Sequence, residues 1–182
     1  MNIRIETERL ILRPFQEDDV DRLFLLDSNP EVMKYVGQKP LTKKEQSAEV
    51  IKMVQKQYAE KGIGRWTVIE KESNLLIGWS GLKLIDYEIN GHQNFYEIGY
   101  RFLPEFWGKG YATESVIPFV KMGFSEFKAE KLYAYADVNN TSSLNVLKKI
   151  GFKEKGTFID DTDGAECMWY EISRELENES QT

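Results

Sequence analysis

The order of elements read from the sequence predicts a mixed α/β fold, in which helices flank a sheet. Short β-rich runs end at proline, glycine or asparagine, and longer segments between them carry apolar residues at helical spacing. The chain has 182 residues, of which 41% are hydrophobic and 30% charged, an ordinary globular balance. We therefore expect a single domain over residues 1–176, followed by a polar tail at 177–182.

The first half of the chain predicts a strand, two helices and a hairpin. Acidic residues and a capping-box pair indicate where the helices begin, and proline and glycine indicate where they end. The expected elements are a strand at 9–13, a helix that follows residues 17–19 and ends at Asn29-Pro30, a helix opened by Thr42 and Glu45 that runs toward Lys61, and strands at 66–70 and 75–85.

The second half alternates strands and helices before a final hairpin. Gly151 stands where a helix commonly ends in the left-handed conformation, and Pro118 should kink the helix that contains it. The expected elements are a strand at 95–103, a helix at 111–127, a strand at 132–138, a helix at 141–150, and a hairpin from Phe158 to the run at 167–172.

Composition excludes several classes of function. The net charge of −6 argues against a nucleic-acid surface, which needs a basic stripe. No apolar run reaches the roughly 20 residues of a membrane span, and the first residues lack the apolar stretch of a secretory signal, so we expect a cytoplasmic protein. With one cysteine, Cys167, and one histidine, His92, we expect no disulfide and no metal site.

The most informative segment is residues 96–114, in which an expected strand runs into a glycine-containing loop and the loop opens an expected helix. Free backbone N–H groups at such a helix start, together with the helix dipole, bind phosphate. Gly108 and Gly110 let the backbone approach a ligand, and Ala112 is small. Neither a Walker A loop nor a dinucleotide-binding loop fits, since Gly110 follows Lys109 and three spaced glycines are absent. A glycine turn without a ligand is the alternative.

A second segment, residues 139–152, follows the loop by one helix and one strand. Its residue types also suit a plain helix with an N-cap and a glycine stop. Its position after the first segment makes it informative.

Together the two segments resemble the GNAT superfamily of N-acetyltransferases. Gly110 and Ala112 match the Gln/Arg-x-x-Gly-x-Gly/Ala pattern of its acetyl-CoA loop, with Trp107 in place of Gln or Arg. Residues 7–15 and 107–114 resemble the Rim-type enzymes, which acetylate the N-termini of ribosomal proteins. The resemblance covers about residues 7–175. A later GNAT motif, Asn-x-x-Ser…Lys-x-Gly-Phe, is matched by Asn140, Ser143, Lys149, Gly151 and Phe152.

This resemblance implies a GNAT fold: a mostly antiparallel central sheet, splayed at the cofactor site and flanked by about four helices. It also implies acetyl-CoA as acyl donor. The pantetheine arm would pair with the strand before the loop, and the pyrophosphate would lie on the loop's N–H groups. The implied cofactor-binding residues are Tyr100, Phe102, Leu103, Trp107, Gly108, Lys109, Gly110, Tyr111, Ala112, Thr113, Asn140 and Ser143.

The chemistry implied is direct attack of a neutral amine on a thioester. Glu97, beside the acetyl position, is the candidate base; a solvated or ion-paired strand carboxylate is the alternative. Many GNAT relatives place a tyrosine acid where Leu147 stands here. Ser143 is therefore the candidate hydrogen-bond donor to the leaving thiolate, with helix capping as its alternative role.

The acceptor that we expect is the N-terminal α-amine of a protein or peptide. The pKa of an α-amine, about 7.7–8.0, leaves it partly neutral in the cytoplasm. A lysine side chain, with a pKa of about 10.4, is almost fully protonated and needs a base to remove its proton. The alternatives are a small-molecule amine, such as a polyamine, antibiotic or amino-acid analogue, and an acyl-CoA-binding module without turnover. We expect no nucleic-acid or membrane partner, and the sequence is compatible with a monomer or a homodimer.

Overall fold

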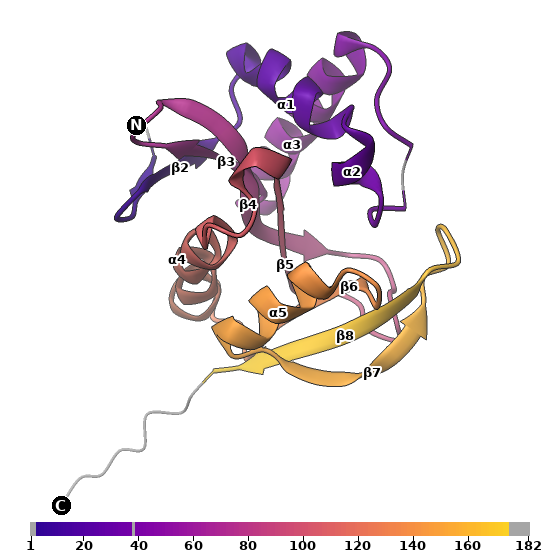
Figure 1. Cartoon of the computed structure of the whole chain (residues 1–182). Coiled ribbons are helices and arrows are strands. Elements are labelled where there is room, and N and C mark those ends of the chain that lie inside the picture. The colour runs from indigo at the N-terminus through magenta and orange to yellow at the C-terminus, as the bar shows by residue number, and fades with distance from the viewer. Residues whose placement is uncertain (1–2, 38, 175–182) are drawn as a thin grey trace, which may run out of the picture.

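The computed structural model describes residues 3–37 and 39–174, so the expected domain end and polar tail lie outside the described residues (Figure 1). In this part of the chain, one sheet has the strand order β1-β2-β3-β4-β5-β6-β8-β7. Only β5 and β6 pair in parallel; the other neighbours are antiparallel. The predicted mixed α/β fold is confirmed. None of the described helices is long and apolar enough to cross a membrane.

The elements follow the expected order with small shifts at their ends. The strands are β1 Ile5–Glu6, β2 Leu10–Pro14, β3 Arg65–Glu70, β4 Leu75–Ile85, β5 Phe95–Phe102, β6 Lys131–Asp137, β7 Lys153–Ile159 and β8 Glu166–Ser173. The helices are α1 Val20–Asp27, α2 Pro30–Met33, α3 Lys44–Lys61, α4 Tyr111–Ser125 and α5 Thr141–Ile150, with 3-10 turns at Glu17–Asp19 and Pro104–Phe106.

Helices cover both faces of the sheet, with α1–α3 on one and α4 and α5 on the other (Figure 1). The side chains of β5 alternate between these faces. Tyr96 packs against Phe127, next to α4, and the Tyr100 hydroxyl contacts Ser143 of α5. Arg101 pairs with Asp27 of α1 on the opposite face. Strand β5 therefore carries groups into both sides of the molecule.

Strands β5 and β6 diverge along most of their length. Eight residues of β5 pair with β4, whereas the β5–β6 contact has the single pair Glu97 and Tyr133. Beyond Glu97, the backbone groups of β5 on that side have no strand beside them in the described part of the chain. This divergence is the predicted splay of the sheet.

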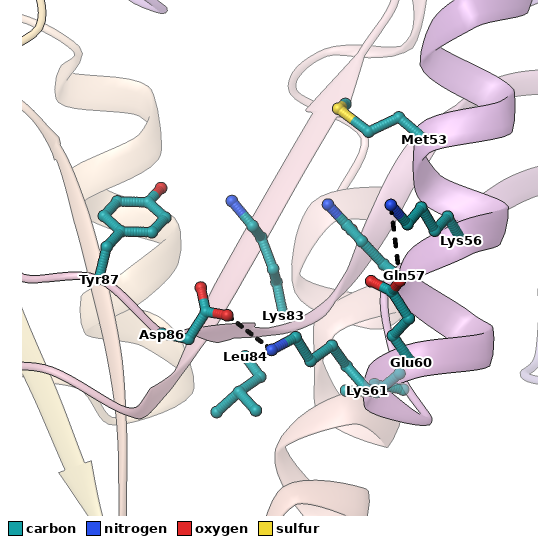
Figure 2. A pocket seen from close by; sticks show the side chains of 10 residues that line it. Met53, Lys56, Gln57, Glu60, Lys61, Lys83, Leu84, Asp86 and Tyr87 are labelled. Carbon is teal, nitrogen blue, oxygen red and sulfur yellow. Dashed lines mark hydrogen bonds and ion pairs between the residues drawn. The ribbon is translucent and has the colours of Figure 1, made fainter.

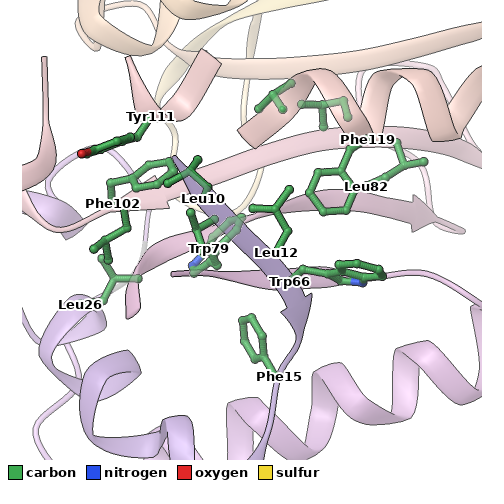
Figure 3. Close-up of a cluster of buried hydrophobic side chains, with 14 of the residues drawn as sticks. Leu10, Leu12, Phe15, Leu26, Trp66, Trp79, Leu82, Phe102, Tyr111 and Phe119 are labelled. Atoms are coloured by element: carbon green, nitrogen blue, oxygen red, sulfur yellow. The ribbon is translucent and has the colours of Figure 1, made fainter. Parts of the chain in front are cut away.

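The main core joins the sheet to the helices on both faces (Figure 3). Trp66 of β3 meets Phe119 of α4 edge to face, with ring centroids 5.6 Å apart. A second cluster, in which Trp169 stacks among Phe95, Tyr133 and Tyr135, covers the end of the sheet near Glu97. The two clusters hold β5 in place from both ends.

The capping-box prediction for α3 is wrong. Lys43 precedes the helix, and the side-chain amide oxygen of Gln46 accepts the N–H groups of Thr42 and Lys43, at 2.9 and 3.0 Å. Gln46 therefore accepts the backbone hydrogen bonds that were expected at Glu45. The capping pair lies one residue later than predicted, because Gln46, rather than Glu45, occupies the third position of the helix.

Two further differences concern proline. Pro30 begins the extra turn α2 instead of only ending α1, because Asn29 caps it through Glu31 N–H at 2.9 Å and proline is tolerated in a first turn. Helix α4 contains Pro118 and ends two residues before the expected Phe127, while the kink at Pro118 stays a prediction.

Candidate active site

The loop between β5 and α4 reaches the helix through two glycines with left-handed backbone angles. Gly108 has φ +72° and Gly110 has φ +82°. A Cβ built at Gly108 meets no atom within 4 Å, and one built at Gly110 meets only Nη2 of Arg9, at 3.5 Å. The surface in front of the loop is therefore open, and the turn needs glycine for its backbone angles.

The backbone N–H groups of residues 108–113 are free donors. The first bond of α4 runs from Glu114 N–H to the Gly110 carbonyl, and Trp107 N–H donates to Pro104. Between these two residues, no N–H group has an acceptor among the described residues. Consecutive free donors at a helix N-terminus suit the pyrophosphate of a nucleotide.

The N-terminal strand region holds the loop in place. Glu114 of α4 accepts hydrogen bonds from Thr7 Oγ1 at 2.6 Å, Arg9 N–H at 2.8 Å and Arg9 Nε at 2.7 Å. Arg9 also donates to the Lys109 carbonyl at 2.9 Å and lies over the Tyr111 ring. Two segments singled out in the sequence, residues 7–15 and 107–114, thus form one contact. Arg9 also places a cation beside the loop, and sequence reasoning missed this role of Arg9.

Two side chains of the loop turn back toward the protein. The Trp107 indole N–H donates to the Phe102 carbonyl at 2.7 Å, while its ring stays half-exposed. Lys109 Nζ lies 5.1 Å from the centroid of the Phe106 ring and is exposed. Trp107 therefore stabilises the end of β5 through this hydrogen bond.

The open edge of β5 faces the splay. Backbone groups alternate sides along a strand, and Leu103 N–H donates to Ile77 of β4 at 3.0 Å. Phe102 and Tyr100 therefore direct their backbone groups away from β4. The Phe102 carbonyl already accepts the Trp107 indole N–H, so the Phe102 N–H and the backbone groups of Tyr100 are left for a chain such as pantetheine. The N–H of Leu103 is already used within the sheet.

Across the splay, Tyr100 meets the start of α5. Its hydroxyl lies 3.0 Å from both the carbonyl and Oγ of Ser143, and burial raises the pKa of this phenol. Asn140 caps α5 by accepting Ser143 N–H at 3.2 Å, so the N-cap is Asn140 and not Ser143, for which capping was the alternative role. Leu147 is buried and offers no acid. The Tyr100 side chain is a functional candidate that sequence reasoning used only for its backbone.

Glu97 lies on the other face of β5, where its strand partner is Lys83 of β4. Its carboxylate has no hydrogen bond or ion pair among the described residues. Burial raises its pKa, while Lys83 and Arg65 act in the opposite direction. A desolvated, unpaired carboxylate at the point where β5 and β6 diverge can accept a proton from an amine.

A hollow of about 300 Å³ lies on the same face, between α3 and the end of β4 (Figure 2). Lys83 points into it beside Tyr87, with Nζ 5.7 Å from the ring centroid. The Lys61–Asp86 ion pair, at 2.6 Å, closes one side. The remaining lining residues include Met53, Lys56, Gln57 and Glu60 of α3. Lys83, the strand partner of Glu97, connects this hollow to the face of β5 that carries Glu97.

The profile of the acetyltransferase (GNAT) domain family matches residues 9–153. The chain belongs to the GNAT acetyltransferase family. It is 35% identical over 154 residues to the uncharacterized N-acetyltransferase p20 of Bacillus licheniformis, covering 85% of this chain and 84% of that protein. It is also 28% identical over 148 residues to the spermidine N(1)-acetyltransferase of Escherichia coli K12, covering 81% and 75%.

Solved structures agree with this family. A GNAT acetyltransferase from Bacillus anthracis superposes with a TM-score of 0.78 at 28% identity, covering 94% of this chain and 98% of that one. RimL, a ribosomal L7/L12 α-N-protein acetyltransferase solved with coenzyme A, gives a TM-score of 0.77 at 18% identity, covering 94% and 98%. The likeness to RimL, at 18% identity, shows a shared fold. GNAT enzymes use acetyl-CoA, and the free N–H groups of the loop fit its pyrophosphate.

Proposed function

We propose that this GNAT N-acetyltransferase transfers the acetyl group of acetyl-CoA to the N-terminal α-amine of a protein or peptide, by direct attack. The observation that carries the proposal is the unpaired, desolvated carboxylate of Glu97 at the splay. A carboxyl group with a raised pKa is suited to an amine whose own pKa is about 7.7–8.0.

The acetyl-CoA site in this proposal is built mainly from backbone. The pyrophosphate lies over the N–H groups of residues 108–113, with the Arg9 guanidinium nearby. The pantetheine arm follows the open edge of β5 at Tyr100 and Phe102, since Leu103 N–H is bonded to Ile77. Asn140 borders the arm with its amide N–H groups, because its side-chain oxygen already caps α5.

The reaction follows from the two faces of β5. Glu97 takes a proton from the ammonium group, directly or through a water, and the neutral amine attacks the thioester carbonyl. The N–C bond forms, the C–S bond breaks and the nitrogen loses its second proton to solvent, which leaves a neutral amide and a thiolate on the side of Tyr100 and Ser143. Tyr100 donates its single proton to the Ser143 carbonyl, so the serine hydroxyl can direct its own proton to the sulfur. The thiolate then takes its proton from solvent.

A small-molecule amine is the second candidate acceptor. Its support is the likeness to a spermidine acetyltransferase, which covers 81% of this chain. The Rim-type subgroup remains part of our proposal, supported by the motifs at residues 7–15 and 107–114 and by their contact in the structure.

The test is thiol release from acetyl-CoA across a panel of amines. The panel contains peptides with a free α-amine, the same peptides with a blocked α-amine and one lysine, and spermidine. We expect release only with free α-amines. Release with spermidine alone would move the acceptor to the small-molecule class. No release with any amine, despite a rise in Tm with CoA, would favour the non-catalytic alternative.

A further inference from the structure

Three charged side chains leave the sheet on the acceptor face. Lys83 of β4 is the direct strand partner of Glu97 on β5. Arg65 of β3 is the partner of Gly81, two residues along β4 from Lys83. Strand partners share a face, as do residues two apart, so all three side chains leave the sheet on one side. We call Arg65, Lys83 and Glu97 the acceptor-face triad.

None of the triad has a partner of opposite charge within ion-pair distance among the described residues. Arg101 provides the internal comparison. Its guanidinium lies on one side of the Trp79 ring and bonds Asp27 at 2.5 Å. Arg65 lies over the same ring, 4.8 Å from its centroid, and has no carboxylate. Two guanidinium groups in matching positions thus differ in whether the protein neutralises them.

Each member of the triad is also partly buried. Burial lowers the pKa values of Arg65 and Lys83 and raises that of Glu97. Two cations and one anion leave an excess of one positive charge, and charges taken from water without a partner are costly. An incoming ligand with one negative charge would balance the site, whereas a polycation would meet two unpaired positive groups.

We propose that the acceptor carries a carboxylate close to its reactive amine, with the carboxylate held by Arg65 and Lys83 and the amine facing Glu97. This inference deepens the proposed function and rests on it. An N-terminal aspartate or glutamate of a peptide has this arrangement, and so does a free amino acid. Arg65 can bind such a group through two parallel N–H donors, while Lys83 acts as a point charge from the neighbouring strand.

The first experiment compares acceptors that differ only in the anion. Peptides that begin with Glu or Gln, and with Asp or Asn, are assayed by thiol release, next to a free amino acid and its amide. We expect kcat/KM to be about tenfold or more higher for the acid of each pair, as one charged hydrogen-bonded pair supplies. A preference confined to the peptides, or to the free amino acid, identifies which source of the carboxylate the enzyme uses.

Equal rates for acid and amide would overturn this inference alone, because the amine would still be acetylated. A preference for spermidine would overturn it as well. Absence of thiol release with every amine would instead overturn the proposed function on which it rests. The two failures are therefore distinguishable in one assay.

The second experiment assigns the preference to the triad. Arg65→Gln and Lys83→Gln should each bring the acid-to-amide ratio of kcat/KM toward one, mainly through a higher KM for the acid. Lys52→Gln, an exposed residue of α3, removes the same charge elsewhere and should keep the ratio. Tm and CoA affinity confirm that each variant is folded. If Arg65→Gln does not fold, Lys83→Gln still decides, and an unchanged ratio there would contradict the proposal.

Discussion

In the proposed site, the cofactor side and the acceptor side of β5 recognise their ligands by different means. On the cofactor side, residues 108–113 offer backbone N–H groups, and the glycines matter for their backbone angles. On the acceptor side, Arg65, Lys83 and Glu97 offer side chains from three strands. A backbone site depends on conformation, whereas a side-chain site depends on which residues stand at scattered positions. Experiments that change one side should leave the other intact.

The largest effect is expected from Glu97→Gln. A positioned general base contributes about 100-fold or more, so single-turnover acetyl transfer should fall by about that factor at low pH. The deficit should shrink as pH rises past the amine's own pKa of about 7.7–8.0. CoA affinity should not change, because Glu97 lies on the acceptor side. Wild-type rates over the whole pH range would remove Glu97 from the mechanism.

The reciprocal change is Gly110→Val on the cofactor side. Valine opposes the left-handed angle of φ +82°, and its branched Cβ obstructs the approach of a phosphate. We expect the Kd for CoA, measured by calorimetry, to rise by about 10- to 100-fold. Gly91→Val is the matched control, with φ +72° and no atom within 4 Å of its Cβ. If both variants bind CoA equally well, the loop is not the phosphate site.

A smaller effect is expected where the two hydroxyl groups meet in the splay. Ser143→Ala should lower turnover by about tenfold, and Tyr100→Phe by less, since Tyr100 acts through the serine. Neither change should add an acid limb to the pH profile, because burial raises the pKa of Tyr100 and serine does not titrate. Tyr96→Phe, which packs on the same face against Phe127, should behave as wild type. A larger loss in Tyr100→Phe than in Ser143→Ala would make Tyr100 the direct donor.

The smallest effect concerns stability. The pKa of Glu97 is raised in the folded protein, so its contribution is most favourable below the unfolded pKa of about 4.3 and is lost as pH rises through the folded pKa. Glu97→Gln should therefore raise Tm at neutral pH by about 2–4 °C, which is about 1 kcal/mol for this size. The gain should vanish in acid. A lower Tm at neutral pH would show that Glu97 stabilises the fold.

The same contrast explains what could be predicted from the sequence. The loop and the start of α5 are local in the chain, so Gly110, Asn140 and Gly151 indicated their backbone conformations, which the structure has. Contacts made by tertiary structure were not visible. The partners of Glu114 lie about a hundred positions away, and Tyr100 reaches Ser143 across 43 residues. The prediction of the α3 cap was wrong for a different reason, since Glu45 and the adjacent Gln46 have similar capping tendencies.

The bonds from Thr7 and Arg9 to Glu114 span 107 and 105 residues, and they connect the segment between β1 and β2 to α4, the helix that follows the proposed phosphate loop. Contacts this remote close last, because the chain between them must first be ordered. The loop therefore gains its final support only when both ends of that long interval have met. During refolding, we expect the ability to bind CoA to return with the last cooperative step. CoA binding would then be a probe for complete folding.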